Sequence, residues 1–404
     1  MVLVMMCAIG RASAQQPPIG IDGGGPDPAT VRVRIGPVWM NPRLELKNIG
    51  VDTNVFDEPD DQNPKRDFTT TISPNLDIWV GIGRTWLQTT IREDIVWYQT
   101  YASERSANET YALSWRVPLN RVSFRIAPSF ETTRERPGYE IDARARHTQW
   151  GGEAQVEVRA LSKTTFGLAT AYKNIAFDDS ATFLGVSLSD QLNRTEASMG
   201  VTVKHELTPL TTIAASARRE RDRFERASLR DSDSTEVDMN VTFDPHALLK
   251  GGAGVGYRDF QPVDRSLPAY TGLTATGDLT YTLLGSTRFQ VQFRRDVSYS
   301  YDINEPYYLE NGITGTVAQQ IFGPFDALVR AGIATLAYRD RTGVAIAAPD
   351  RVDDIRTFGG GAGYHIGSSG TRLGLNVEHA TRSSALAERR YSGLRYGASV
   401  TYDF

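Results

Sequence analysis

The last nine residues, Tyr396-Gly-Ala-Ser-Val-Thr-Tyr-Asp-Phe404, alternate between two kinds of side chain. Tyr396, Ala398, Val400, Tyr402 and Phe404 are apolar or aromatic, and the residues between them are small or polar. Because successive side chains of a strand point to opposite faces, the segment predicts a strand with one apolar and one polar face. Such a strand fits a closed barrel whose outside meets lipid and whose inside holds water.

The same two-residue period recurs along the whole chain. Clear examples are residues 67–80, 110–117, 236–243, 273–283 and 372–378. An α-helix would repeat every 3.6 residues, so these segments predict strands, roughly eighteen in all. Their abundant Thr, Val, Tyr and Phe are residues that favour strands.

Short connections between these segments alternate with long ones. This alternation is typical of outer-membrane barrels, which have short periplasmic turns and longer external loops. It predicts an all-β fold, a closed antiparallel transmembrane barrel of about eighteen strands with sixteen as the alternative, and both termini in the periplasm. The predicted turns are 81–84, 118–121, 160–163, 206–209, 244–251, 284–286, 322–324 and 367–370, and the predicted loops are 52–66, 102–109, 131–146, 174–191, 219–234, 258–270, 302–306, 339–353 and 380–389.

Composition leaves a soluble all-β sandwich as the alternative fold. The 404 residues are 40% hydrophobic and 23% charged, with a mean hydropathy of −0.35. After the first ten residues no apolar run approaches the roughly 20 that a spanning helix needs. Sandwich strands usually have about five or six residues, whereas many segments here are about twice as long. Aromatic residues near segment ends also predict an interfacial girdle on the outer face: Trp97, Trp115, Trp150, Tyr172, Tyr281, Tyr299 and Tyr402.

The N-terminus predicts export. Residues 1–14 form a short apolar run ending in Ala-Ser-Ala, typical of a signal peptide cut after Ala14. Residues 15–36, rich in Gly, Pro and Asp, predict a flexible periplasmic lead-in, and residues 37–404 the barrel. Cleavage would remove Cys7, the one cysteine, and with it any disulfide or cysteine metal site. The net charge of −4 gives no indication of nucleic-acid binding.

Two charged residues fall on otherwise apolar faces. Glu93 and Arg295 each follow a predicted periplasmic turn by about a membrane thickness of strand. Either both lie at the outer rim, where a charge costs about 0–1 kcal/mol, or a β-bulge exchanges the two faces.

The search for catalytic or metal-binding groups predicts none. No two of the five histidines have the spacing of a metal pair. His147 and His379 lie near external loops with Asp142 and Ser383, but every barrel rim is rich in Ser and Asp, so a triad is disfavoured. The acidic cluster 57–61 could bind calcium, although a solvated loop is the favoured interpretation. No cofactor is predicted.

The inner face carries most of the functional information. Barrels of about 16–18 strands leave an aqueous channel, and the predicted lumen charges have both signs, which argues against strong ion selectivity. An external loop could fold inward, and 174–191 is one candidate. The predicted lumen-lining charged residues are Asp77, Arg116, Arg125, Glu157, Arg159, Asp238, Asp278, Arg288, Arg294, Arg372, Glu378 and Arg395.

The run Arg218–Arg226 is dense in charges of both signs at the top of a predicted hairpin. Its arginines could pair with the phosphates of outer-leaflet lipopolysaccharide. The favoured interpretation is a hairpin that rises above the membrane with alternating ion pairs.

Two segments resemble known proteins. Pro42–Phe56, which ends in Asp52-Thr-Asn-Val-Phe56, resembles the opening of the Putative beta-barrel porin 2 family, and a diffuse likeness extends to Phe404. The last strand resembles the terminal strand of outer-membrane barrels, which the assembly machinery reads. The resemblance implies the assembly signal Tyr396, Val400, Tyr402 and Phe404.

The family resemblance also implies a function. Several relatives are linked with secretion of exopolysaccharide or capsule, and the family has no catalytic residues to transfer. The predicted function is therefore an outer-membrane channel for polysaccharide export, and not an enzyme. The alternatives are a general diffusion porin for small hydrophilic solutes, or a non-channel barrel serving as adhesin, anchor or enzyme. The expected partners are outer-membrane lipid and lipopolysaccharide, the barrel assembly machinery and periplasmic polysaccharide-export components.

Overall fold

The computed structural model describes residues 25–403, except 27, 29, 245–246 and 368–369. The predicted signal peptide, most of the lead-in and Phe404 lie outside the described residues. No helix in the described part of the chain is long and apolar enough to cross a membrane.

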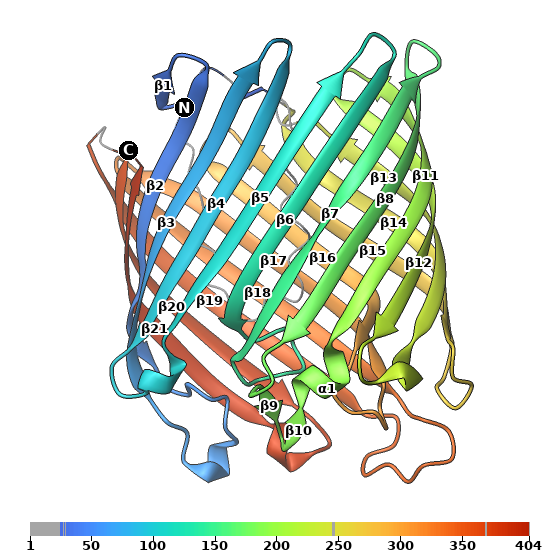
Figure 1. Ribbon diagram of the computed structural model, residues 1–404. Helices are drawn as coiled ribbons and strands as arrows, with labels where there is room; N and C mark the ends of the chain where they lie inside the picture. Colours follow the sequence, from blue (N-terminus) through green and yellow to red (C-terminus); the bar gives the residue numbers. More distant parts are fainter. Residues whose placement is uncertain (1–24, 27, 29, 245–246, 368–369, 404) are drawn as a thin grey trace.

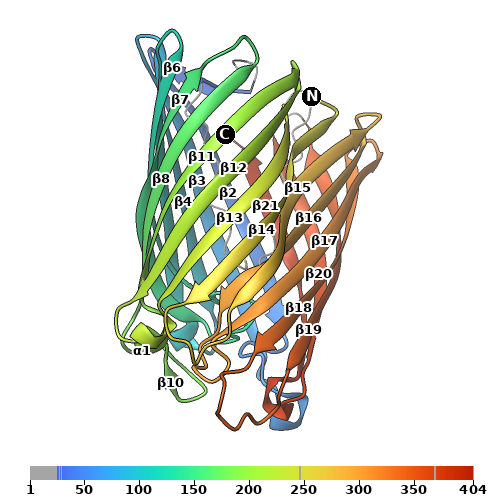
Figure 2. The same ribbon diagram turned by 90° about the vertical axis from the view of Figure 1, so that its right-hand side faces the viewer.

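Most of the described strands form one antiparallel sheet that closes on itself, and β9 and β10 form a separate small hairpin (Figures 1 and 2). The sheet has nineteen strands: the short β1 (Val33–Ile35) and eighteen long ones. The last strand pairs with the first long strand, which closes the barrel. The predicted fold class and the count of eighteen strands are therefore confirmed. The long strands are β2 (Val38–Asp52), β3 (Asp67–Ile82), β4 (Thr85–Tyr98), β5 (Ser106–Pro118), β6 (Val122–Glu135), β7 (Ala145–Arg159), β8 (Thr164–Phe177), β11 (Arg194–Thr208), β12 (Thr211–Phe224), β13 (Ser232–Phe243), β14 (Leu249–Pro262), β15 (Tyr270–Leu283), β16 (Thr287–Tyr299), β17 (Tyr307–Phe322), β18 (Phe325–Arg339), β19 (Val352–Ile366), β20 (Thr371–Ser383) and β21 (Tyr391–Asp403).

The two ends of the barrel differ as the spacing predicted. Tight turns join the strands at the end where β2 begins and β21 ends, and long loops join them at the other end (Figure 1). Below, these are called the periplasmic and external ends. The long loops contain the short elements η1 (Asp60–Gln62), η2 (Ala102–Glu104), β9 (Thr182–Phe183), β10 (Val186–Ser187), α1 (Leu188–Leu192), η3 (Ser228–Arg230) and η4 (Ala387–Arg389).

The end of the predicted lead-in is more ordered than expected. β1 forms a hairpin with the start of β2, pairing Val33 with Met40 and Ile35 with Val38. The barrel's first long strand thus begins at Val38, one residue after the predicted start.

Large apolar side chains cover the outer face, as a lipid-facing surface requires. Leu168, Val201, Val237 and Leu375 are among those that project outward and are exposed. Most of the predicted girdle is exposed as well: Trp97, Trp115, Trp150, Tyr172, Tyr281 and Tyr402.

The girdle prediction was wrong for Tyr299. Its hydroxyl donates to Asp222 Oδ2 at 2.6 Å, and its ring packs edge-on against Phe224 with ring centroids 4.8 Å apart. Tyr299 is the last residue of β16 at the external end. There the ring joins the interior of the loops, where a buried Tyr hydroxyl finds a hydrogen-bond partner.

The two outward charges lie in regular strands. Glu93 pairs in register with Glu109 of β5 and accepts a hydrogen bond from the Tyr111 hydroxyl at 3.2 Å. Arg295 pairs in register with Asn311 of β17. The β3–β4 pairing skips Glu93, but its register is the same on both sides of the gap, and the β4–β5 and β16–β17 registers do not shift at either charge. The bulge explanation is therefore excluded, and strand alternation directs both charges outward.

The first and last long strands meet at a β-bulge. The β2 register shifts at residues 47–50, where Asn48 has a φ of 56°. At this point β2 and β21 approach so closely that a Cβ on Gly50 would lie 2.0 Å from the Tyr396 carbonyl oxygen. Gly50 therefore has to lack a side chain.

The predicted assembly signal lies on the outer side of β21. Tyr396 and Tyr402 are exposed there, and Val400 is half-buried between its neighbouring strands. Phe404 lies outside the described residues.

Candidate functional site: the constriction of the lumen

The barrel encloses a cavity of about 2450 Å³. Its lining includes residues of the periplasmic turns, such as Ser286 and Pro324, and continues to Arg136 and Arg144 near the external end. The predicted lumen residues at this cavity are Asp77, Arg116, Arg125, Glu157, Arg288, Arg372, Glu378 and Arg395.

The other four predicted lumen residues, Arg159, Asp238, Asp278 and Arg294, do not line this cavity. Arg294 lines a second, smaller cavity. Asp238 accepts a hydrogen bond from Ser216 Oγ at 2.6 Å, and Asp278 accepts from Gln290 and Gln292. Arg159 is at the periplasmic end of β7, where its side chain is 60% exposed and 3.9 Å from Glu206.

Charges on the cavity wall are mostly paired with opposite charges on neighbouring strands. Glu157 lies 2.5 Å from Lys204 Nζ and 3.1 Å from Arg116 Nη2. Asp326 lies 2.6 Å from Arg372 Nη2 and 2.8 Å from His365 Nε2. The wall therefore alternates in sign over short distances.

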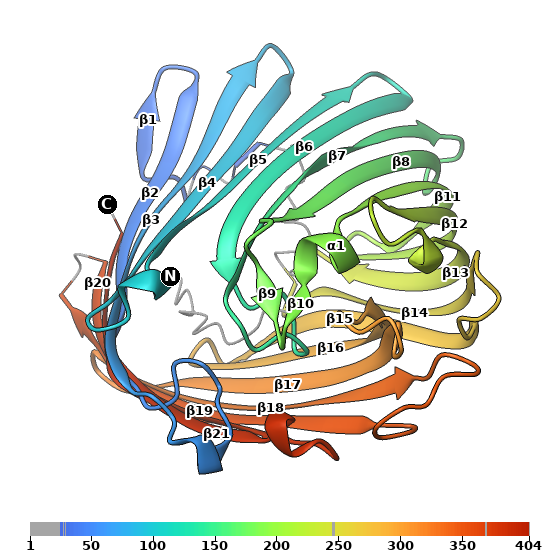
Figure 3. The same cartoon turned by 60° about the horizontal axis from the view of Figure 1, so that its bottom comes forward.

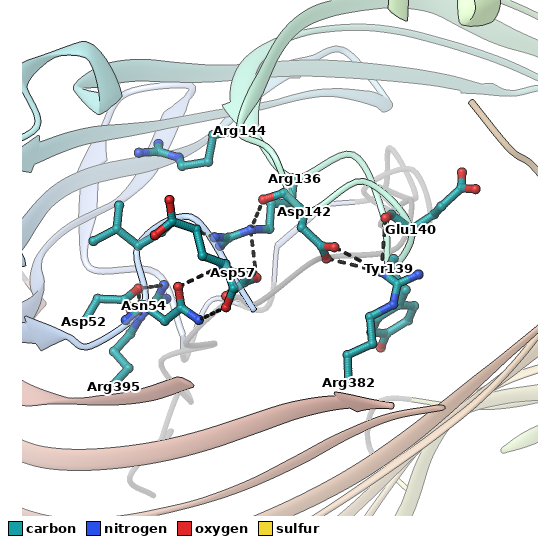
Figure 4. Close-up of polar contacts among 12 residues, drawn as sticks. Asp52, Asn54, Asp57, Arg136, Tyr139, Glu140, Asp142, Arg144, Arg382 and Arg395 are labelled. Atoms are coloured by element: carbon teal, nitrogen blue, oxygen red, sulfur yellow. Dashed lines mark hydrogen bonds and ion pairs between the residues drawn. The ribbon is translucent and has the colours of Figure 1, made fainter. Parts of the chain in front are cut away.

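Residues 136–144, which join β6 to β7, fold inward across the external end of the lumen and are called the inward loop below (Figure 3). At the start of this loop the buried Arg136 lies 3.1 Å from Asp57 Oδ2. It also donates to the carbonyl oxygens of Val55 at 2.8 Å and Asp142 at 2.6 Å (Figure 4). Asp57 holds the pKa of Arg136 above its ordinary value although burial opposes this.

The segment that carries the family resemblance connects this loop to the barrel seam. Asp52 accepts hydrogen bonds from Arg395 of β21. Asn54 is fully buried and donates to the carbonyl oxygens of Glu58 and Ser392. The neighbouring Val55 then binds Arg136 of the inward loop.

The middle of the inward loop reaches the opposite wall. The Glu140 carboxylate accepts hydrogen bonds from Ser300 Oγ at 2.6 Å and from the Tyr301 backbone N–H at 3.0 Å. Burial raises the pKa of Glu140, and the hydrogen bond from Ser300 and the charges of Arg389 and Arg351 counteract this rise.

Two arginines from the last external loop and β20 hold the inward loop from the other side. Arg382, whose side chain is 0% exposed, lies 3.2 Å from Asp142 and 2.6 Å from Asp353. It also donates to the carbonyl oxygen of Glu140 at 3.1 Å (Figure 4). Arg389 Nη1 lies 2.9 Å from the same Asp142 carboxylate.

A hydrophobic cluster supports the inward loop from the β8–β11 connection. Ile141 packs with buried Phe183, Leu188, Leu192 and Tyr301. The segment 174–191, the candidate from the sequence, thus packs against the inward loop, and residues 136–144 are the part that crosses the lumen.

A small cavity of about 60 Å³ remains beside the inward loop. Gly138 and Glu140 border it on the loop side. His147 and Arg194 border it on one wall of the barrel, and the opposite wall contributes Arg294, Tyr308 and Glu310. Arginine and carboxylate side chains therefore face each other at the narrow part of the lumen.

The structure separates the residues considered for catalysis. Asp142 is engaged by Arg382 and Arg389. His379 Nε2 lies 3.0 Å from Ser392 Oγ, and Ser383 Oγ donates to a backbone carbonyl. His147 is buried, and its ring stacks on Phe177.

Two of the four acidic residues considered for calcium are engaged in ion pairs, and the other two, Asp60 and Asp61, are exposed. Asp57 pairs with Arg136, and Glu58 lies 2.5 Å from Lys65 Nζ. In the described part of the chain, no group of three or more His, Cys, Asp or Glu side chains could hold a metal ion.

Sequence reasoning missed the constriction because its partners are far away in the chain. The predicted long loop 131–146 contains the inward loop, and the sequence shows that this loop is rich in arginine and acidic residues. Nothing in the sequence paired Asp142 with Arg382, which is 240 residues later.

Comparisons with known proteins agree with this architecture. A BenF-like porin from Pseudomonas fluorescens Pf-5 has a TM-score of 0.51 at 11% identity, covering 92% of this chain and 99% of that one, which shows a common fold. The outer membrane protein opdK from Pseudomonas aeruginosa aligns with a TM-score of 0.49 at 12% identity, over 90% of this chain and 98% of that one. OccAB4 from Acinetobacter baumannii aligns at 0.46 and 8% identity, over 94% and 100% of the two chains.

A comparison with curated proteins found no match. The family model described as Putative beta-barrel porin 2 matches residues 27–404, which include every strand of the barrel. The chain therefore belongs to the Putative beta-barrel porin 2 family and is a porin-like channel of the outer membrane.

Proposed function

We propose that this protein is a passive channel for small hydrophilic solutes and that the inward loop sets the size limit. The observation that carries the proposal is the attachment of residues 136–144 to the barrel by buried ion pairs on two sides, Arg136–Asp57 and Arg382–Asp142. Removing one partner of a buried pair costs about 3–5 kcal/mol. A loop held this firmly keeps the lumen narrow.

The charges beside the inward loop support a channel without strong preference for one sign of ion. Arg194 and Arg294 line the small cavity together with Glu140 and Glu310. Rings of one sign produce ion selectivity, and this constriction combines both signs. Polar solutes that form hydrogen bonds are the solute class that fits it.

Polysaccharide export is the second candidate. The cavity reaches the periplasmic turns, and polar side chains such as Gln155 and Asn376 line it. Amide side chains form hydrogen bonds with hydroxyl groups such as those of sugars, and the family resemblance points the same way. A polymer would pass only if the inward loop were displaced.

Single-channel conductance in planar bilayers tests the proposal. Replacing residues 137–141 by Gly-Gly should raise the conductance and allow longer maltooligosaccharides to block the current. The matched control shortens the exposed stretch 343–347 of the β18–β19 loop, which should leave both readouts unchanged.

Three outcomes are informative. A small wild-type conductance that rises only in the 137–141 variant supports the solute channel. Passage of long oligosaccharides through the wild type would favour export instead. An unchanged conductance after shortening 137–141 would remove the inward loop as the size filter.

A further inference from the structure

The charged run 218–226 lies mainly on β12, which directs its charges alternately to two faces. The even-numbered residues point into the barrel. Arg218 Nη2 lies 2.6 Å from Glu236 of β13, and Glu220 lies 2.7 Å from Arg258 of β14. The odd-numbered residues consequently point outward.

Three arginines form a row on this outer face: Arg219, Arg221 and Arg223. Arg219 stands opposite Met199 of β11, whose side chain is 61% exposed on the lipid side. Arg219 and Arg223 share the Asp233 carboxylate, at 3.5 Å and 2.6 Å. Arg221 is exposed and, within the described structure, has no carboxylate within 4.0 Å.

The row keeps an excess of positive charge. Asp231 is the second carboxylate near it, 4.0 Å from Arg223 Nε. Three guanidinium groups against two carboxylates leave one positive charge (3 − 2 = 1). Asp259 of β14 stands two strands away from Arg219, beyond Thr235 of β13. Arg226, above the row, pairs with the loop residues Asp179 and Asp190.

The row lies at the height of the outer leaflet's headgroups. Arg219 follows Leu210 of the periplasmic turn by nine residues (219 − 210 = 9). A strand that rises about 3.4 Å per residue and is tilted by about 40° gains roughly 23 Å over that length. The apolar band of such barrels is about 25 Å tall, so Arg219 is at its edge and Arg221 and Arg223 are above it.

A furrow continues from the row toward the membrane centre. The next outward residues on β12 are Ala217 and Ala215, which are small. Their register partners on both neighbouring strands are larger and exposed, so β12 forms the floor between two ridges: Val201, Val203, Val237 and Met239. A furrow of this kind, with an apolar floor, accommodates one acyl chain.

We propose that the outer face of β12 is a binding site for lipopolysaccharide of the outer leaflet. Arg219, Arg221 and Arg223 bind a lipid A phosphate, and one acyl chain lies over Ala217 and Ala215. Guanidinium groups bind phosphate oxygens through paired, charge-assisted hydrogen bonds. Among outer-membrane lipids, the anionic glycolipid matches the net positive charge above an acyl furrow, whereas zwitterionic phospholipid does not.

Native mass spectrometry of the folded barrel in detergent, with bis-phosphorylated lipid A as the probe, tests the charged half of the site. The triple variant Arg219→Gln, Arg221→Gln, Arg223→Gln should bind lipid A at least about tenfold more weakly, because each charge-assisted hydrogen bond contributes more than a neutral one. Heat-modifiable electrophoretic mobility confirms that the variant is folded.

Arg356→Gln is the matched control. Arg356 is also exposed and points outward, opposite Ile333 on β18, at a similar distance from its periplasmic turn. The Arg356→Gln variant should bind lipid A as strongly as the wild type does. Three results would overturn the proposal. Lipid A binding could fall equally in both variants, it could remain unchanged in the triple variant, or the wild type could retain phosphatidylethanolamine as well as it retains lipid A.

Filling the furrow tests the acyl half independently. Ala217→Leu with Ala215→Leu leaves the three arginines in place and raises the floor between the ridges. It should weaken binding of lipid A and leave binding of the deacylated phosphorylated disaccharide unchanged. Wild-type lipid A binding by this variant would eliminate the furrow. The proposal does not depend on the channel function, so all variants should conduct as the wild type does.

Discussion

Asp52 of β2 and Arg395 of β21 are 343 residues apart in the chain, yet Asp52 Oδ2 lies 2.6 Å from Arg395 Nη2. Asp52 is fully buried, and the pair bridges the first and last long strands where the barrel closes. The same short segment continues through Asn54 and Val55 to Arg136 of the inward loop. Closure of the barrel and constriction of the lumen are thus structurally linked.

Breaking this pair should destabilise the barrel strongly. Arg395→Gln removes the guanidinium charge that faces the buried Asp52 carboxylate, which should lower the free energy of unfolding by about 3–5 kcal/mol. Urea unfolding in lipid vesicles measures it. Arg159→Gln is the matched control, because its pair with Glu206 is exposed and should contribute about 0–1 kcal/mol. Similar losses in the two variants would contradict a special role for the seam.

Arg382 should control the position of the inward loop. Arg382→Met keeps the volume of the side chain but removes the groups that bind Asp142, Asp353 and the Glu140 carbonyl. We expect a higher and noisier single-channel conductance and a stability loss of about 3–5 kcal/mol. The control is Arg390→Met, because the exposed Arg390 bonds carbonyl groups of its own loop within the described structure. The current noise of this variant should equal that of the wild type. A quiet current in both variants would show that other contacts hold the loop.

Stability should fall as the pH rises from about 5 to 8 because of Glu305 in the β16–β17 loop. Burial raises the pKa of Glu305 to about 7, although Arg351 Nη2 lies 2.9 Å from it. The folded protein then holds a proton that the unfolded chain, with an ordinary Glu pKa near 4.3, has released, so stability is lost as pH rises through 7. The full difference is at most about 3 kcal/mol.

The transition temperature of heat-modifiable mobility, measured at pH 5 and pH 8, checks this dependence. Glu305→Gln should flatten it, since the amide does not titrate. An identical pH dependence in the variant and the wild type would assign the effect to another group.

The charge of Glu93 should lower the stability of the barrel only slightly. Because it points outward near the external rim and is bonded by Tyr111, Glu93→Leu should change the free energy of unfolding by less than about 1 kcal/mol. Ile91→Glu introduces the same charge two residues deeper on the same face and should destabilise more. A gain of several kcal/mol in Glu93→Leu would place Glu93 inside the hydrocarbon layer.

Sequence periodicity was sufficient to predict the barrel because contact with lipid constrains each strand separately. Every outward residue must tolerate lipid and every inward residue water, so the two-residue period, the turns and the number of strands were all readable. The same local rule explains the failure at Tyr299. At the external end no lipid dictates orientation, and the ring turned toward Asp222.

The constriction could not be read from the chain in this way. Arg136, Glu140 and Asp142 look like the charges of any solvated loop, and their partners Asp57, Ser300 and Arg382 come from other loops and strands. Closure of the cylinder decides which loops meet over the lumen, because it brings strands from both ends of the chain side by side. The sequence by itself, through its composition and its two-residue period, therefore determined the wall of this channel. The narrowest part of the lumen exists only through contacts that form once the barrel has closed.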